Sequence, residues 1–291
     1  MTASSCDRSA VHVRLLRLFA SPTYQPPRLP QVALEIMELS QRPEVSFAQV
    51  GAVLEKDPLL AAKVLSIAQS AMYAPRSPIL SLRQAGVRLG LKTLRDLVLE
   101  AAVSMRVFRA PGYGDAMERL SRHSTATAYL LRALCRRTGL DADYAFLCGL
   151  LHDVGLAACL LALSDEPRGG VVPFDALGPA LHDLHEEASG LVTRLWGLPA
   201  EVQQLAATHH QLAVGGRPDP LHAALIVAEA LAADQGAGME PAGVQGGLDQ
   251  NGPELREQAC AALGLDAPAL AAARVEASEI LGALGGVAPA A

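Results

Sequence analysis

The chain has 291 residues, of which 51% are hydrophobic and only 4% are aromatic, and its formal net charge is −6. This length allows one large core or two modest ones, and the scarcity of Thr, Tyr, Phe and Trp favours packed helices over sheets. The charged residues form no block of one sign, which argues against direct binding to nucleic acid.

The five cysteines form no CxxC pair, a pattern typical of free thiols in a reducing compartment. The N-terminus has no signal-peptide pattern, and no uninterrupted apolar run reaches the roughly 18 residues that a membrane helix needs. We therefore expect a soluble, cytoplasmic protein of bacterial type that has no membrane partner.

The first half of the sequence predicts helices and shows no strand-like alternation. Asp57-Pro58 indicates a helix start, with Asp as the N-cap and Pro at the first helical position, and Ser81 with Gln84 matches a capping box. Apolar residues then recur at helical spacing. Helices are predicted over residues 12–19, after Leu29-Pro30, and over 47–54, 57–73, 81–90 and 92–108, with a turn at 75–78.

The second half also predicts helices, over residues 117–138, 141–163, 181–195, 200–211, 220–233, 254–263 and 268–284. Residues 164–180 are rich in Pro and Gly and predict a loop, whereas residues 234–253 predict a flexible excursion. Glycines near residue 112 indicate a domain boundary. We expect an all-α fold with an N-terminal extension (1–24), a helical N-terminal part (25–110), a helical bundle (111–233) and a C-terminal region (234–291).

Six of the eight histidines lie between residues 123 and 210, and two acidic residues accompany them in the predicted helices. The candidate metal ligands are His123, His152, Asp153, His185, His209, His210 and Glu229. Imidazole and carboxylate ligands without a thiolate suit a divalent transition metal, with Fe or Mn favoured over Zn. Asp153 lies in the middle of the series and could bridge two ions, which predicts a dinuclear centre.

Each of these residues also has a structural interpretation. A lone buried histidine such as His123 is more often a hydrogen-bonded core residue than a ligand. His152 and Asp153 could be a polar pair that faces a partner helix, and His209-His210 could be a surface pair near a helix end. His182 lies on the same helical face as His185 and is an alternative ligand. His12 and His222 carry no predicted role.

Several motifs resemble those of the HDOD branch of the HD superfamily of metal-dependent phosphohydrolases, over about residues 25–235. In the first half the motifs are Leu29-Pro30, Asp57-Pro58-Leu59-Leu60-Ala61-Ala62-Lys63-Val64-Leu65, Ala68-Gln69-Ser70-Ala71-Met72-Tyr73, Ile79-Leu80-Ser81-Leu82, Ala85 and Leu89-Gly90. In the second half they are His123-Ser124, Gly149-Leu150-Leu151-His152-Asp153-Val154-Gly155, His185, Trp196-Gly197-Leu198-Pro199 and His209-His210.

The resemblance implies a helical N-terminal subdomain packed on an HD-like helical bundle. It also assigns the ligands to two ions that share Asp153 and activate a water for attack on phosphorus. The first ion would be held by His123, His152, Asp153 and Glu229. The second would be held by Asp153, His185, His209 and His210.

The sequence departs from active cyclic-dinucleotide phosphodiesterases of the HD-GYP type at two places. Leu156 follows Gly155 where those enzymes have lysine, and residues 211–214 stand where they have a Gly-Tyr-Pro segment. A smaller departure is Glu229, where aspartate is usual. Gln69 departs instead from the HDOD signature, which usually has Asn at this position.

These departures favour a stand-alone signalling or regulatory module that binds a regulatory protein partner and holds a metal centre without turnover. A nucleotide second messenger is a second candidate ligand. The alternative function is a metal-dependent phosphohydrolase acting on a nucleotide or cyclic dinucleotide, with Asp153 as its catalytic residue.

Overall fold

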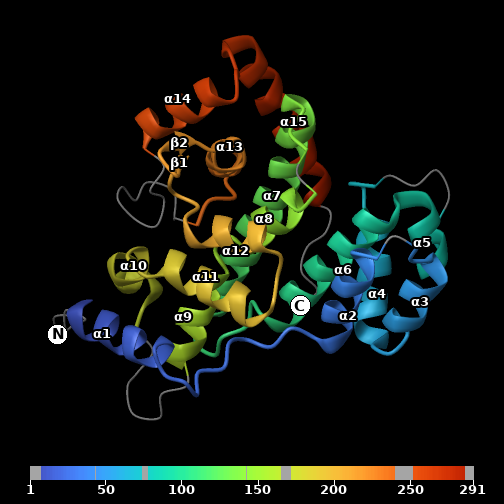
Figure 1. The fold of residues 1–291 in the computed structure, drawn as a ribbon, viewed down its shortest axis with the longest axis horizontal. Coiled ribbons are helices and arrows are strands. Elements are labelled where there is room, and N and C mark those ends of the chain that lie inside the picture. Colours follow the sequence, from blue (N-terminus) through green and yellow to red (C-terminus); the bar gives the residue numbers. More distant parts are fainter. Residues whose placement is uncertain are drawn as a thin grey trace. The chain divides into compact units, whose positions relative to one another are not determined.

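The computed structural model describes residues 8–42, 44–73, 78–141, 143–164, 172–239 and 252–285. The chain forms two compact units (Figure 1). Unit 1 comprises Met1–Pro27 and Phe108–Ala277, and unit 2 comprises Arg28–Val107 and Ser278–Ala291. The described residues form helices joined by turns and irregular connections, with one hairpin of two two-residue strands, so the predicted all-α class is confirmed.

Unit 2 is built around α6 (Leu91–Arg106), which packs against three other helices of the unit. Ten consecutive residues of α6 are buried, and they include the ion pair of Arg95 with Asp96 (2.8 Å). Asp57 caps α4 as predicted, because its side chain accepts the amide hydrogen bond of Leu60. The other helices of unit 2 are α2 (Gln31–Ser40), α3 (Phe47–Leu54), α4 (Pro58–Ala68) and α5 (Leu82–Leu89).

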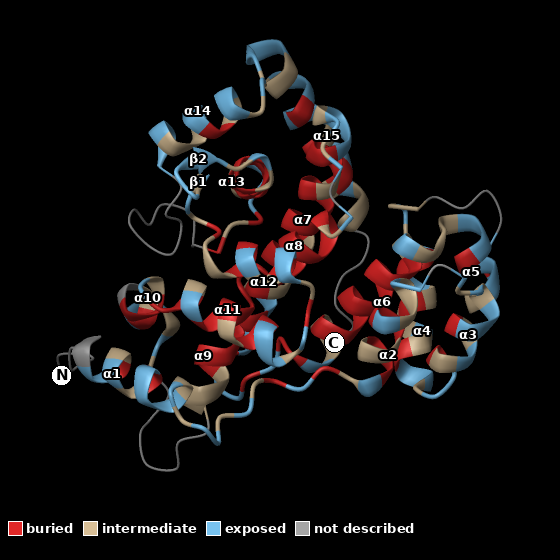
Figure 2. Cartoon of the chain, in the orientation of Figure 1, coloured by how far each residue is buried: buried red, intermediate tan, exposed pale blue. Residues whose placement is uncertain are grey.

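Unit 1 is built around α7 (Gly114–Thr138), which packs against α8 (Ala145–Leu151) and α13 (Pro220–Asp234). A second group consists of α9 (Val154–Ser164), α11 (His185–Leu195) and α12 (Ala200–Ala207), with α11 in the middle. Figure 2 shows that the buried residues of this unit are concentrated in α7, α8, α9, α11 and α13.

The remaining elements lie at the periphery of unit 1. They are α1 (Arg8–Phe19), α10 (Phe174–His182), the hairpin β1 (Ala213–Val214) with β2 (Arg217–Pro218), α14 (Pro253–Ala262) and α15 (Ala267–Leu284), whose last residues are assigned to unit 2.

Two of the predicted helices are each divided in the structure. The single helix predicted over residues 141–163 breaks at His152 and Asp153, where α8 ends and α9 begins. The helix predicted over 181–195 breaks at residues 183–184, and its first turn belongs to α10. The prediction of a loop at 164–180 is wrong over residues 174–180, because these residues belong to α10. Leu177 and Leu181 are fully buried, and this burial stabilises α10 despite Gly178-Pro179 in its interior.

Other boundaries differ from the prediction by smaller amounts. The helix from Asp57 ends at Ala68 instead of Tyr73, and α12 ends at Ala207, so His209 and His210 lie in a turn. Ser81 caps α5, but Gln84 accepts from Leu80, so only half of the predicted capping box forms. Most of the turn at 75–78 and most of the excursion at 234–253 lie outside the described residues.

The stretch Ala145–Ser164 has the length and composition of a membrane span, with 20 residues and a mean hydropathy of 2.0. However, 83% of its most apolar window is buried inside the structure. In unit 1 the stretch comprises α8, α9 and the junction between them, and it contributes Leu150, Leu151 and Leu156 to the core.

Candidate metal centre

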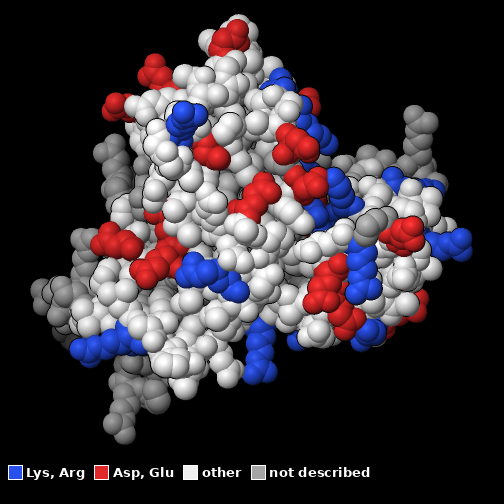
Figure 3. Space-filling model, viewed as in Figure 1, with Lys and Arg blue, Asp and Glu red and all other residues white. Residues whose placement is uncertain are grey.

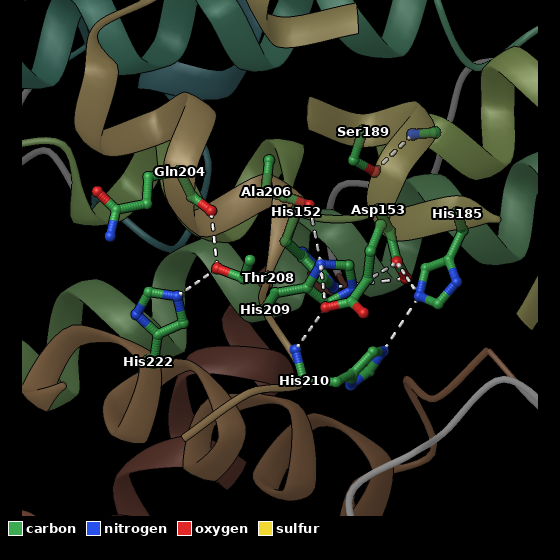
Figure 4. Close-up of polar contacts among 12 residues, drawn as sticks. His152, Asp153, His185, Ser189, Gln204, Ala206, Thr208, His209, His210 and His222 are labelled. Atoms are coloured by element: carbon green, nitrogen blue, oxygen red, sulfur yellow. Dashed lines mark hydrogen bonds and ion pairs between the residues drawn. The ribbon is translucent and has the colours of Figure 1, made fainter. Parts of the chain in front are cut away.

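The seven predicted ligands come from three helices, one helix junction and one turn, and all lie in unit 1. His123 lies in the middle of α7, and Glu229 lies in α13. His152 and Asp153 form the junction between α8 and α9, and His185 is the first residue of α11. His209 and His210 follow the end of α12. The structure brings all seven together (Figure 4 shows five of them with their neighbours).

The first half of the centre consists of His123, His152, Asp153 and Glu229. The Nε2 atoms of His123 and His152 lie 3.1 Å apart. His152 Nε2 also lies 3.1 Å from Glu229 Oε1 and 3.4 Å from Asp153 Oδ2. These donor atoms belong to side chains that are less than a tenth exposed.

The second half consists of Asp153, His185, His209 and His210. The other oxygen of the same carboxylate, Asp153 Oδ1, lies 3.3 Å from His209 Nε2 and 3.7 Å from His185 Nε2. The Nε2 atoms of His185 and His210 lie 3.1 Å apart. Asp153 therefore directs one oxygen into each half, as a bridging ligand would.

Backbone carbonyl groups orient four of the five histidines. Each donates from its Nδ1–H group to a carbonyl oxygen. His123 donates to Ala237 (2.9 Å), His152 to Gly149 (2.8 Å), His185 to His182 (2.9 Å) and His209 to Ala206 (3.1 Å). A proton on Nδ1 leaves Nε2 as the free lone pair in a neutral ring. Outer hydrogen bonds of this kind orient metal-bound histidines in proteins.

Burial keeps three of the histidines neutral. Burial and the neighbouring His152 lower the pKa of His123, and burial together with His209 lowers the pKa of His185 despite the attraction of Asp153. Burial and His209 lower the pKa of His210 to about 3. Neutral imidazoles are the form that binds a metal ion.

The other three groups concentrate charge in the first half. Burial alone would lower the pKa of His152, but Asp153 and Glu229 raise it well above its usual value. Burial would raise the pKa of both carboxyl groups. His152 instead holds the pKa of Asp153 well below its usual value and that of Glu229 at about 2. Two buried carboxylates therefore stabilise a positive charge here, which either a proton or a metal ion could carry.

The donor atoms fit a divalent cation. Asp153 Oδ1 and His209 Nε2 are buried without a hydrogen-bond partner, which costs about 1–3 kcal/mol for each unsatisfied atom. Nitrogen ligands that share one ion at about 2.1 Å lie roughly 3.0–3.4 Å apart, and both Nε2 pairs lie 3.1 Å apart. A pair of divalent ions bound here would supply an activated water or a fixed cluster of positive charge.

Sequence reasoning missed the residues that support these ligands. Glu186 Oε1 accepts the backbone N–H of His210 (3.0 Å), and its only signal was its position next to His185. His222 Nε2 also contacts the hydroxyl of Thr208, the residue before His209 (3.0 Å; Figure 4). His182, the alternative ligand, contributes its backbone carbonyl, and its side chain belongs to neither group of potential ligands among the described residues.

Comparisons with known proteins agree with this fold. The family model of the HDOD domain matches residues 26–212. An uncharacterized protein of Treponema pallidum (strain Nichols) is 26% identical over 196 residues, which make up 64% of this chain but only 38% of that protein.

Two solved structures have a similar fold. One is a Shewanella amazonensis SB2B protein named provisionally as a metal-dependent phosphohydrolase (20% identity, TM-score 0.69, 94% of this chain and 98% of that one). The other is a Marinobacter aquaeolei VT8 protein named provisionally as a signal transduction protein (21% identity, TM-score 0.61, 98% of this chain and 66% of that one). With the family model matching more than half of its length, the chain belongs to the HDOD domain family.

Proposed function

We propose that this HDOD protein is a cytoplasmic regulatory module that holds a dinuclear Fe or Mn centre in unit 1 and acts through contacts with a protein partner. The burial of the candidate centre carries this proposal. His152 and His209 are fully buried, and Asp153 and Glu229 are only 5% and 7% exposed. A phosphohydrolase must bring a substrate phosphate to its metal-bound water, and so deep a site favours a structural or sensing role.

Leu156 supports the same proposal. It occupies the position after Gly155 where the phosphodiesterases that the sequence resembles have lysine. Leu156 is fully buried in α9, so this position offers the core an apolar group and offers a substrate no hydrogen-bond donor.

The surface of the protein supports a role in protein contact. Three large apolar side chains of unit 2 are mostly exposed, namely Leu59 (67%), Leu80 (76%) and Val87 (63%). On the face drawn in Figure 3, acidic and basic side chains are interspersed, which suits a protein partner better than nucleic acid.

The alternative function is a metal-dependent phosphohydrolase that acts on a nucleotide or a cyclic dinucleotide. The complete set of seven candidate ligands favours this function. His210 is partly exposed, so a nucleotide would approach the centre from the side on which His210 lies.

Hydrolysis assays on metal-loaded protein separate the two functions. Wild-type protein loaded with Mn²⁺ or Fe²⁺ is incubated with a panel of nucleotides, cyclic dinucleotides and a chromogenic phosphodiester, beside Asp153→Ala. We expect bound metal and no turnover that depends on Asp153. Hydrolysis by the wild type that Asp153→Ala abolishes would establish the enzyme and contradict the regulatory proposal.

A further inference from the structure

The turn after α12 presents two candidate ligands that lie outside any helix. The helix ends at Ala207, and His209 and His210 follow in a turn closed by the hydrogen bond from Gln211 N–H to the Thr208 carbonyl (2.9 Å). By contrast, His123 and Glu229 lie within long helices. The position of the two histidines must therefore be set by contacts from outside the turn.

A hydrogen-bonded chain from α13 provides such a contact (Figure 4). His222 Nε2 lies 3.0 Å from the Thr208 hydroxyl oxygen, and His222 Nδ1 lies 2.9 Å from Asp219 Oδ1. Because a carboxylate only accepts, Nδ1 donates to Asp219. The Thr208 hydroxyl also lies 2.9 Å from the Gln204 carbonyl oxygen of α12, so Thr208 links His222 to the last turns of that helix. His222 is only 3% exposed, whereas the side chain of Asp219 is 36% exposed.

Asp219 fixes the ring of His222 and the start of α13 together. The same oxygen, Oδ1, accepts the backbone N–H groups of Leu221 and His222, both at 3.0 Å, as the N-cap of the helix. His222 is therefore held by its backbone and its ring at once. A histidine without a predicted role is in this way anchored beside the turn.

The helix that carries His222 also carries Glu229. The two residues are seven positions apart, which is about two helical turns, so they lie on one face of α13. Glu229 contacts the first half of the centre through His152 (3.1 Å), while His222 contacts the turn that bears two ligands of the second half. One rigid helix thus contacts both halves.

We infer that Thr208, His222 and Asp219 are positioning residues that hold the His209–His210 turn in register with the second half of the metal centre. This inference rests on the proposed metal centre and adds to it a hydrogen-bonded contact between α13 and the turn that bears His209 and His210. Removing an outer partner of a metal ligand typically weakens metal binding by about 10- to 100-fold. The loss should be confined to the second half, because the first half has its own ligands.

Cobalt titration with two variants of Thr208 tests the inference. Co²⁺ is added to metal-free protein, and its visible absorption and calorimetric binding are followed for wild type, Thr208→Val and Thr208→Ser. We expect Thr208→Val to weaken one of two binding phases by about 10- to 100-fold. Thr208→Ser, which keeps the hydroxyl, should bind like the wild type.

Variants of His222 and Glu229 assign the phases. The amide of Asn replaces Nδ1 and is too short to reach Thr208, whereas the amide of Gln reaches about as far as Nε2. We expect His222→Asn to behave like Thr208→Val and His222→Gln to retain more of the wild-type affinity. Glu229→Gln should weaken the other phase.

The outcomes separate this inference from the proposed metal centre. If wild type binds Co²⁺ in two phases and Thr208→Val binds it equally well, the positioning role is wrong while the centre stands. If both phases weaken together in proportion to a lower melting temperature of the metal-free variant, Thr208 acts only on general stability, which also overturns the inference. If wild type binds no Co²⁺, both fall.

Discussion

Asp153 is the residue on which the candidate centre depends most. Its carboxylate directs one oxygen into each half, through Oδ2 to His123 and His152 and through Oδ1 to His185 and His209. The sequence predicted this role from the central position of Asp153 in the series. It could not predict that Glu186 and His222 support the ligand turn, because those contacts join residues 24 and 14 positions apart.

Leu156→Lys tests whether position 156 faces the core or a substrate. The leucine is fully buried, so we expect the lysine to lower the free energy of unfolding by at least about 3 kcal/mol and to confer no hydrolysis. Leu156→Met is the matched control and should cost less than about 1.5 kcal/mol. Denaturant unfolding of the metal-free variants measures both. A stable lysine variant that gains phosphodiester hydrolysis would show that the position faces substrate.

The two halves should differ in how their metal affinity depends on pH. The carboxylates raise the pKa of His152 well above its usual value, so below that pKa a proton must leave before an ion binds the first half. Its affinity should therefore fall as the pH is lowered, by up to about tenfold per pH unit for one displaced proton.

In the second half the pKa values of His185 and His210 are lowered, that of His210 to about 3, so these rings are already neutral near pH 7. These two ligands should therefore add little to the pH dependence of this half between about pH 6 and 8, and we expect the shallower slope here. Mn²⁺ titrations at several pH values measure both slopes. Equal slopes in the two phases would contradict the assigned charges.

At the scale of the elements, the break between α8 and α9 positions the central pair. The sequence predicted one continuous helix here, because the residues on both sides of His152 and Asp153 are apolar. The structure ends α8 at Leu151, and His152 Nδ1 donates to the Gly149 carbonyl while Leu156 N–H donates to the Asp153 carbonyl. Gly155 N–H also donates to the Ser189 hydroxyl of α11 (2.8 Å), a contact that only the folded bundle supplies.

The same limitation explains most of the other differences. Start signals such as Asp57 predicted helix N-termini well, because a cap is a local interaction. The helix α10 was missed because Gly178-Pro179 reads as a loop, while the burial of Leu177 and Leu181 is a tertiary effect.

Gly155→Ala tests how closely α9 must approach α11. A Cβ atom at Gly155 would overlap the His185 carbonyl oxygen and the Ser189 amide nitrogen, both backbone atoms that cannot move independently. We expect a loss of about 1–3 kcal/mol in the free energy of unfolding and weaker metal binding, because His185 would shift. Thermal and denaturant unfolding with metal titration measure these effects.

Gly51→Ala is the matched control for this substitution. Gly51 lies in α3, and nothing lies within 4 Å of its Cβ position. The alanine should raise the free energy of unfolding by about 0.5–1 kcal/mol, because alanine has a higher helix propensity than glycine. Unchanged stability and metal affinity in Gly155→Ala would show that the two helices are not in close contact.

At the scale of the whole molecule, the centre lies entirely within unit 1. Metal that binds only the folded state stabilises it by about 2.7 kcal/mol at a free concentration 100 times its Kd. Chelation should therefore speed hydrogen exchange in α8, α9, α11 and α13, whereas exchange in α2 to α6 of unit 2 should change little. Hydrogen-exchange mass spectrometry measures this difference. Equal loss of protection in both units would contradict a centre confined to unit 1.

The metal content of the purified protein tests the central claim most directly. Wild type and Asp153→Asn are prepared without chelator from cells supplied with iron and manganese, and their bound metals are measured by elemental analysis. We expect about two equivalents of Fe or Mn in the wild type, because Asp153 directs one oxygen into each half. Asp153→Asn should lose most of both. A wild type without bound metal, or an Asp153→Asn variant with undiminished metal, would contradict the account.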